Sequence, residues 1–403
     1  MKICDLTQFY SPVSGGVKRY VSEKVRHLRA QTRDDEHILI IPGEADRVEA
    51  GERSRVYTIR SPLISRTSRY RVLLRLEEIE RVLERERPDV IESGDPYQVA
   101  WKAIHSGAAL GIPVVGFYHS HFPEAYLRSA QKFLGATATE FLLDFSRRYV
   151  RSLYNRFALT LVPSPALGGV LKEWGVTNVA QTDLGVDTGI FHPSPAGVAG
   201  TRAELGVPTG RRLLMYAGRL APEKNTRTLF AAFAQLAREY PGEFHLLVVG
   251  DGHERAPLAQ LARGLGGDAT LSTAPRVAPA LSWVPYCGDS ARLAEYYRAA
   301  DLFIHPGVQE TFGLVTLEAQ ACGTPVVGIR GSYMDRIIHS GQTHWAAENS
   351  PASLAAAILE TLRHPPAHTR AELGRQIAEQ YSWERVFKRL FDLYHDVIEH
   401  RRE

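Results

Sequence analysis

Short apolar runs alternate with longer stretches of helical period along most of this chain. Between strand-like runs lie segments such as 17–30 and 71–87, whose apolar residues recur every three or four positions. Strands that alternate with helices predict parallel sheets with right-handed crossovers, and therefore an α/β fold. In the first half, the runs rich in Ile and Val are residues 2–6, 37–42, 89–93 and 112–121.

The alternation stops once and then starts again. Residues 188–212 are rich in Gly, Pro and Ser, which is typical of an interdomain linker. We predict two Rossmann-like domains, 1–190 and 191–381, with a C-terminal helix over about 382–403 that packs back on the first domain. The carboxyl ends of two such sheets usually border a ligand cleft. The later strand-like runs are 212–220, 244–252, 281–288, 301–306 and 324–329.

Composition excludes several classes of protein. The 403 residues carry a net charge of +3, with 44% hydrophobic and 23% charged residues, which indicates a globular protein without a strong preference for nucleic acid. Cys4, Cys287 and Cys322 lie far apart, which favours a reducing compartment without disulfides. No apolar run approaches the length of a membrane span, and the first residues do not resemble a signal peptide. We therefore expect a cytoplasmic protein.

Two glycines follow the first predicted strand and open the next helix. In "SPVSGGVKRY", Gly15 and Gly16 stand where free backbone N–H groups and a helix N-terminus can hold a phosphate. A tight turn explains the same pair equally well. Neither the dinucleotide-binding nor the P-loop fingerprint is met.

Two cations follow the first strand of the second half. In "AGRLAPEKN", Arg219 ends the strand and Lys224 lies further round the turn. A fixed guanidinium and a mobile ammonium at one strand end suit a diphosphate. Two solvated loop cations remain the alternative.

A histidine ends another strand. His119 closes the apolar run of "IPVVGFYHSH", where it can face substrate in the cleft or serve a structural role. Zinc would need further ligands, and His305 and Cys322 are not grouped with it in the sequence. No metal site is predicted.

Two carboxylates surround the start of a predicted helix in "HPGVQETFGLVTLEAQACG". Glu310 lies in the loop before the helix, and Glu318 lies about one and a half turns inside it. Solvated charges, a metal pair and an acid/base pair are possible from spacing alone. Two acceptors separated by the amides of residues 312–314 also match a nucleotide sugar, with Glu310 at the sugar hydroxyls, Glu318 at the ribose and the amides at phosphate.

Together these motifs resemble the retaining glycosyltransferases of family 4, which have the GT-B fold. The Glu-x7-Glu signature of that family stands here as Glu310 and Glu318, and "GRLAPEKN" resembles its diphosphate segment. "SGGV", "YHSHFP" and "GVDTGIFHP" resemble its first-domain glycine loop, its strand-end histidine segment and the segment that joins its domains. The match runs from residue 1 to about residue 395.

The resemblance implies a role for each matching residue. Arg219 and Lys224 would neutralise the donor diphosphate, and His119 would touch a hydroxyl of the transferred sugar. Asp335 and His344 stand where the family commonly has Glu and Gly, so contacts in that region are not carried over. The implied catalytic residues are His119, Arg219, Lys224 and Glu310. The implied donor-binding residues are Gly15, Gly16, Arg219, Lys224, Glu310, Thr311, Phe312, Gly313, Leu314 and Glu318.

The implied reaction moves a hexosyl group, with mannose or glucose favoured, from a GDP- or UDP-hexose to a hydroxyl of a glycan, lipid or small molecule. Configuration would be retained through front-face attack, with the leaving diphosphate as base and without a metal or other cofactor. Alternatives are a nucleotide-sugar epimerase or phosphorylase, or a non-catalytic regulator that binds nucleotide sugars. A phosphorylase would carry a pyridoxal phosphate lysine, which we cannot place, and a regulator would not need both cations.

A basic segment in the first domain suggests where the acceptor is bound and of what kind it is. Residues 60–75 place arginines, among them Arg66, Arg69, Arg71 and Arg75, between Leu, Ile, Val and Tyr. Such a segment can dock on an anionic lipid surface, which would make the protein peripheral on the inner face of the membrane and the acceptor lipid-linked. The alternative is a solvated helix face whose arginines pair with Glu77, Glu78 and Glu80.

Overall fold

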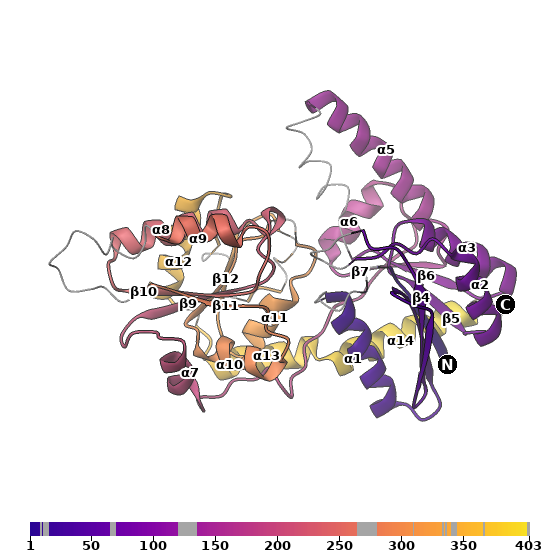
Figure 1. The fold of residues 1–403 in the computed structure, drawn as a ribbon, viewed down its shortest axis with the longest axis horizontal. Coiled ribbons are helices and arrows are strands. Elements are labelled where there is room, and N and C mark those ends of the chain that lie inside the picture. Colours follow the sequence, from indigo (N-terminus) through magenta and orange to yellow (C-terminus); the bar gives the residue numbers. More distant parts are fainter. Residues whose placement is uncertain are drawn as a thin grey trace. The chain divides into compact units, whose positions relative to one another are not determined.

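The chain forms two compact units. Unit 1 comprises Met1–Leu184 with Trp383–Glu403, and unit 2 comprises Gly185–Ser382 (Figure 1). The computed structural model describes the chain except residues 9, 11–15, 65–69, 120–134, 264–279, 309, 333, 335, 336, 340–344, 366 and 401–403. The predictions for Gly15, Arg66, Arg69, Asp335 and His344 therefore lie outside the described residues.

Unit 1 is built on an eight-stranded sheet in the order β3-β4-β2-β1-β5-β6-β7-β8. All neighbouring strands are parallel except β3 and β4, which pair antiparallel. The strands are β1 (Lys2–Leu6), β2 (Glu36–Gly43), β3 (Arg47–Gly51), β4 (Ser54–Arg60), β5 (Val90–Ser93), β6 (Val114–Phe117), β7 (Leu159–Val162) and β8 (Val179–Gln181).

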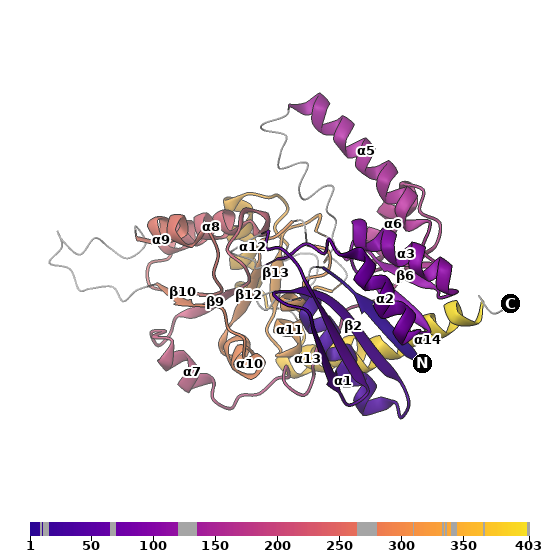
Figure 2. The ribbon, with the colours of Figure 1, turned by 45° about the vertical axis from the view of Figure 1, so that its right-hand side comes forward.

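Helices cover this sheet. The C-terminal helix α14 lies beside α1, and α2 lies beside α3 (Figures 1 and 2). The helices of unit 1 are α1 (Gly16–Gln31), α2 (Leu76–Glu86), α3 (Gln98–Leu110), α5 (Ala136–Tyr154), α6 (Pro165–Glu173) and α14 (Trp383–Glu399). The predicted return of the C-terminal helix to the first domain is thus confirmed.

Unit 2 is built on a five-stranded parallel sheet in the order β11-β10-β9-β12-β13. Figures 1 and 2 show α8, α9 and α12 on one side of this sheet and α7, α10 and α13 on the other. The strands are β9 (Arg212–Ala217), β10 (Phe244–Val249), β11 (Leu281–Val284), β12 (Leu302–His305) and β13 (Val326–Gly328). The helices are α7 (Val198–Glu204), the 3-10 turn η2 (Pro222–Lys224), α8 (Thr226–Glu239), α9 (Arg255–Arg263), α10 (Ser290–Ala299), α11 (Leu314–Ala321), α12 (Pro351–Arg363) and α13 (Arg370–Tyr381).

Buried strands explain why the apolar runs were readable in the sequence. β10 and β12 are buried along their whole length, and parallel strands covered on both faces need apolar side chains at every position.

The residues that cap α6 in unit 1 do so as the sequence predicts. Ser164 accepts a bond from the amide of Leu167 at 3.2 Å, Pro165 begins α6, and Gly175 follows it with φ +87°.

Two local predictions need correction, and one element was not predicted. The helical pattern over 71–87 becomes a helix only from Leu76, and residue 71 instead forms an antiparallel bridge with Leu63. The segment 188–212 is not linker throughout, because it contains α7, which packs on α10. The β3–β4 hairpin was not predicted, since β3 is exposed along its whole length and lacks an apolar run.

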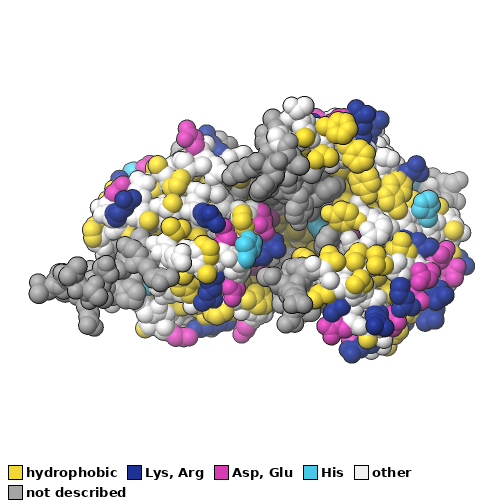
Figure 3. Space-filling model, turned by 45° about the horizontal axis from the view of Figure 1, so that its top comes forward, with side chains coloured by type: hydrophobic (Ala, Val, Ile, Leu, Met, Phe, Trp, Pro, Cys, Tyr) yellow, Lys and Arg dark blue, Asp and Glu magenta, His cyan; other side chains and the backbone are white. Residues whose placement is uncertain are grey.

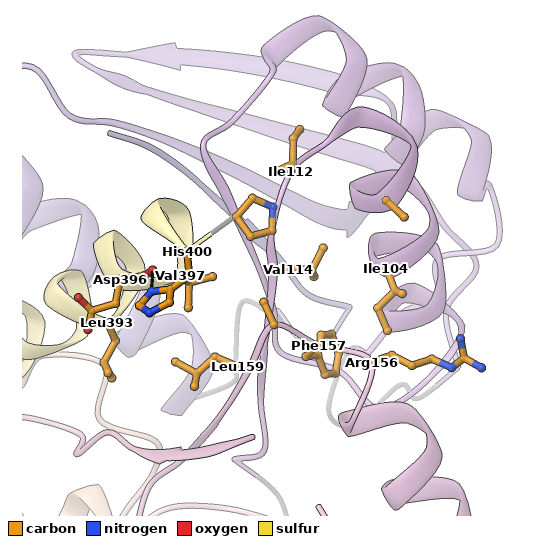
Figure 4. Close-up of a pocket in the computed structure, with 13 residues that line it drawn as sticks. Ile104, Ile112, Val114, Arg156, Phe157, Leu159, Leu393, Asp396, Val397 and His400 are labelled. Atoms are coloured by element: carbon orange, nitrogen blue, oxygen red, sulfur yellow. Dashed lines mark hydrogen bonds between the residues drawn. The ribbon is translucent and has the colours of Figure 1, made fainter. Parts of the chain in front are cut away.

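A cavity of about 680 Å³ opens in unit 1 between α3, the amino ends of β6 and β7, and α14 (Figure 4). Its lining is mostly aliphatic and contains none of the predicted site residues. In the described parts of the chain no helix is both long and apolar enough to cross a membrane.

Candidate active site

The turn after β9 positions the first predicted cation. The amide of Gly218 donates to Val249 O at 3.0 Å, and the hydroxyl of Tyr216 donates to Arg219 O at 2.9 Å. These bonds place the Arg219 backbone at the carboxyl end of β9. Its half-exposed guanidinium lies 3.0 Å from the carboxylate of Glu223, four residues on. Arg219 is therefore already paired with an exposed carboxylate in this structure.

The second predicted cation contacts the first predicted carboxylate. Lys224 Nζ donates to Glu310 Oε2 at 2.5 Å, and His305 Nε2 lies 3.7 Å from the same oxygen. Burial raises the pKa of Glu310, but the Lys224 ammonium and the His305 imidazole outweigh burial and hold that pKa well below its usual range. Glu310 is therefore an anion at neutral pH, and burial together with its charge raises the pKa of the neighbouring Tyr216.

Asn225 ties the two loops of this pair together. Its side-chain amide donates to Pro306 O at 2.9 Å, and its Oδ1 accepts from Thr228 Oγ1 at 2.7 Å. Asn225 has φ +55° and joins η2 to α8. The loop after β9, which carries Lys224, is thus fixed to the loop after β12, which carries Glu310.

The second predicted carboxylate lies in α11. Glu318 is 3% exposed, and its Oε2 accepts from the hydroxyl of Tyr297 in α10 at 3.1 Å. The helix begins after Gly313, which has φ +81° and supports the left-handed turn. The first amides of α11 have no acceptor within the helix, so the amides at residues 313–315 and the positive end of the helix dipole suit an anion.

The neighbouring predicted residues serve α11 in different ways. Phe312 is buried and packs edge-on against Tyr381, with ring centroids 6.4 Å apart. Thr311 and Leu314 are partly exposed; Thr311 precedes Phe312, and Leu314 follows Gly313. The stretch 310–318 therefore presents carboxylates and backbone amides, while Phe312 anchors it in the core.

Unit 1 carries the other predicted residues at the carboxyl edge of its sheet. Gly16 begins α1 after β1, and His119 follows β6; β5 lies between these two strands. The His119 ring contacts Phe117 edge-on at 5.6 Å and lies close to Gly94, where an added Cβ would come within 3.4 Å of Nε2. Burial lowers the pKa of His119, and hydrogen bonding with the backbone of Gly94 partly offsets this. The imidazole is therefore neutral at neutral pH.

Sequence analysis did not identify three residues that contact the predicted site residues. Glu223 is the carboxylate partner of Arg219, and its i, i+4 spacing is a signal that could have found it. His305 was considered only as a metal ligand, although it ends a strand as His119 does. Tyr297 lies 21 residues before Glu318, and no local pattern links the two.

The described residues contain no group of three or more His, Cys, Asp or Glu placed to hold a metal ion. Cys4, Cys287 and Cys322 form no disulfide. Figure 3 shows side chains of both charges and a histidine gathered at one place on the surface of unit 2. Paired cations, buried carboxylates and helix-terminal amides at one sheet edge can bind a ligand that offers both phosphate and hydroxyl groups.

Comparisons with known proteins show the family of this chain. The family described as "Glycosyltransferase Family 4" matches residues 14–190, and "Glycosyl transferases group 1" matches residues 211–364. A GDP-mannose-dependent alpha-(1-6)-phosphatidylinositol dimannoside mannosyltransferase of Mycobacterium tuberculosis is 30% identical over 396 residues, which is 96% of this chain and 94% of that protein. A GDP-mannose-dependent alpha-mannosyltransferase of Corynebacterium glutamicum is 27% identical, covering 99% of this chain and 89% of that protein.

Solved structures share the fold. Anabaena HepE in complex with UDP-glucose superposes with a TM-score of 0.73 at 18% identity, covering 98% of this chain and 100% of that one. Sucrose-phosphate synthase from Thermosynechococcus elongatus also gives 0.73, at 20% identity and 99% coverage of both chains. Two α/β units built on parallel strands, with this arrangement of motifs, define a glycosyltransferase of the GT-B fold. The chain belongs to glycosyltransferase family 4, as its motifs predicted.

Proposed function

We propose that this glycosyltransferase transfers mannose from GDP-mannose to a hydroxyl acceptor with retention of configuration. The observation that carries the proposal is the contact of Lys224 with Glu310 beside the N-terminus of α11, with Glu318 buried further along the same helix. The sequence leaves GDP- and UDP-hexoses open. GDP-mannose is favoured because two relatives that align along nearly the whole chain are GDP-mannose-dependent mannosyltransferases.

In the proposed complex the donor lies along the carboxyl edge of the unit 2 sheet. The first-turn amides of α11 face the diphosphate, and Lys224 and Arg219 exchange their carboxylate partners for its oxygens. Glu318 accepts hydrogen bonds from the ribose hydroxyls, and Glu310 accepts them from the hydroxyls of the sugar. His119, being neutral, can donate to or accept from a sugar hydroxyl.

The protein's contribution to the proposed reaction is mainly electrostatic. Negative charge develops on the diphosphate as the glycosidic bond breaks, and fixed cations and amides stabilise it most in the transition state. The leaving diphosphate takes the acceptor proton on the same face as it departs. Glu310 orients the sugar in this scheme and forms no covalent intermediate.

The acceptor is proposed to be a lipid-linked glycan at an anionic membrane surface. In the basic segment, Arg71 bonds Glu44 at 2.8 Å, and Arg75 bonds Asp46 at 2.7 Å and Glu78 at 2.6 Å. A bilayer would have to compete with these carboxylates for Arg71 and Arg75. Co-sedimentation with anionic and neutral vesicles at low salt tests the membrane part separately, because transfer to a water-soluble acceptor does not need it.

The donor proposal is tested by thermal unfolding with GDP-, UDP- and ADP-sugars. A matching nucleotide at 100 times its Kd adds about 2.7 kcal/mol to the free energy of unfolding. GDP-mannose should give the largest shift, and Glu318→Ala should abolish it. Tyr297→Phe, which removes the bond to Glu318 but leaves the carboxylate, should keep most of it.

Retention is tested by NMR of the product anomer after transfer from GDP-mannose. An α-linked product from the α-linked donor supports the proposal. A β-linked product refutes retention, and a full GDP-mannose shift in Glu318→Ala refutes the ribose assignment. Absence of transfer from every nucleotide sugar would remove the proposed reaction altogether.

A further inference from the structure

His305 is a buried histidine beside the proposed sugar-binding carboxylate. It ends β12, and its side chain is 4% exposed. An added Cβ at Gly307 would lie 2.9 Å from its Cε1, so the chain turns closely against the ring after the strand. The backbone at Gly307 thus lies close to the Cε1 side of the ring, and Nε2 lies towards Glu310.

The two ring nitrogens of His305 have different surroundings. Nε2 lies 3.7 Å from Glu310 Oε2, which is too long for a hydrogen bond but is a close electrostatic contact. Nδ1 is buried and has no hydrogen-bond partner among the described residues. A neutral imidazole carries one proton, and the carboxylate favours that proton on Nε2. The ring is therefore aimed at Glu310 as a donor that is not yet engaged.

Donor binding creates a charge problem at Glu310. The same oxygen that faces His305 accepts the 2.5 Å bond from Lys224. If the donor diphosphate takes that ammonium, Glu310 loses its main partner while it remains largely buried. A buried carboxylate without a partner is unfavourable and gains a proton more readily.

We propose that His305 is a positioning residue that takes over Glu310 when Lys224 turns to the donor diphosphate. A movement of about 1 Å brings Nε2 within hydrogen-bond distance of Glu310 Oε2. Glu310 then stays ionised and correctly oriented towards the sugar hydroxyls through the reaction. This inference rests on the proposed function, because it requires a diphosphate that engages Lys224.

His305 is the neighbour of Glu310 that is suited to replace Lys224 as its hydrogen-bond donor. The side chains that lower the pKa of Glu310 are Lys224 from η2 and His305 from β12. Glu310 in turn raises the pKa of Tyr216, at the end of β9. Tyr216 already donates its proton to Arg219 O. His305 thus remains with a donor directed at the carboxylate.

The kinetic test compares His305→Leu with His305→Gln, whose amide can still donate. Leu should lower kcat by about 10–100-fold with a smaller effect on the KM for GDP-mannose, because the bond forms after Lys224 has moved. The acidic limb of the kcat–pH profile should move to higher pH in the Leu variant, since Glu310 in the donor complex then protonates more easily. The Gln variant should keep most of the wild-type kcat, and its acidic limb should lie close to the wild-type pH.

A matched control is His245→Leu. His245 is a buried histidine near the amino end of β10 that bonds Ser282 Oγ at 2.8 Å, away from the carboxyl edge of the sheet. This substitution should lower stability and leave the acidic limb in place. It shows what the loss of a merely structural histidine does to the same measurements.

A spectroscopic test avoids activity. With 15N-labelled histidine in the wild-type protein, GDP should move the Nε2–H proton of His305 downfield, and His305→Gln assigns that signal. Two outcomes would overturn the inference and leave the proposed transferase reaction intact. One is an equal loss of kcat in the Leu and Gln variants, with the acidic limb of the pH profile unchanged. The other is an Nε2–H signal that saturating GDP does not move. If no nucleoside diphosphate binds or no sugar is transferred, the proposed function fails and the inference fails with it.

Discussion

At the scale of single residues, unit 1 contains an unusual buried charge. Lys24 of α1 is completely buried and bonds Asp5 Oδ1 of β1 at 2.8 Å and Glu92 Oε2 of β5 at 3.2 Å. His37 adds a 2.7 Å contact to Asp5, and Tyr394 bonds both Lys24 and Glu92. Burial tends to raise both carboxyl pKa values, but Lys24 and His37 lower the pKa of Asp5 to about 2, whereas the pKa of Glu92 stays raised.

We predict that Lys24→Met lowers the free energy of unfolding by about 3–5 kcal/mol at neutral pH, because it leaves two buried carboxyl groups without their ammonium. In the wild type, the depressed pKa of Asp5 contributes stability above its ordinary pKa of 3.8, which is lost as pH falls towards about 2. In the variant the ammonium no longer lowers that pKa and only His37 still does, so the cost should shrink as pH falls below about 4. Urea unfolding at several pH values measures this.

The control for this prediction is Lys102→Met. Lys102 bonds Glu80 at 2.5 Å near the surface of the same unit, and such a pair contributes less than about 1 kcal/mol. A cost for Lys24→Met as small as that of Lys102→Met, or one that grows towards acid pH, would contradict the account of the buried cluster.

At the scale of elements, α11 depends on the turn that starts it. Gly313 has φ +81°, and an added Cβ would lie 2.4 Å from Met334 Sδ, a side chain that is fully buried. The glycine thus sets both the direction of the helix and the position of its first amides. The candidate site needs that turn, because Glu310 precedes it and Glu318 follows it.

We predict that Gly313→Ala costs about 1–2 kcal/mol of backbone strain, with a further cost from the contact with Met334. It should also weaken nucleotide binding, which thermal-shift titration measures. The control is Gly331→Ala, which has φ +84° but no atom within 4 Å of an added Cβ. Equal losses of stability and of nucleotide affinity in the two variants would show that the contact at Gly313 has no special role.

At the scale of the whole molecule, the chain does not finish unit 1 before it builds unit 2. α14 belongs to unit 1 and follows all of unit 2 in sequence. Trp383 stacks on Phe387 at 4.9 Å, and Tyr20 of α1 contacts both rings. The buried residues of α14 are Trp383, Val386, Phe387, Leu390, Phe391 and Tyr394.

We predict that a chain ending at Ser382 loses the folded structure of unit 1 and keeps that of unit 2. Burial of these six side chains at about 1.5–3 kcal/mol each contributes roughly 9–18 kcal/mol, which is as large as the usual stability of a domain, about 5–15 kcal/mol. Hydrogen exchange should show lost protection in β1 and β2 and retained protection in β9 and β12. A chain ending at Glu399 should behave as the wild type, and full protection of β1 in the shorter chain would refute the prediction.

The architecture, and the residues proposed for much of the candidate site, could be predicted from the order of residues along the chain. Strands that are buried on both faces require apolar side chains at every position. The continuous apolar runs of β10 and β12 could therefore be recognised in the sequence. Lys224 and Glu310 could be found because each lies in the segment between the carboxyl end of a strand and the next α-helix, where parallel sheets collect functional residues. Their roles in binding remain predictions.

The partners of these residues could not be predicted, because they come from segments that are distant in sequence. The bond between Lys224 and Glu310 requires β9 and β12 to be neighbours in the sheet. Local periodicity does not predict the order of strands in a sheet, so this bond could not be predicted. For the same reason, Lys24 and Tyr394 looked like ordinary residues of two amphipathic helices until folding buried both beside Glu92. Periodicity reports which face of an element is apolar, whereas the environment of a charged group depends on segments that are distant in sequence.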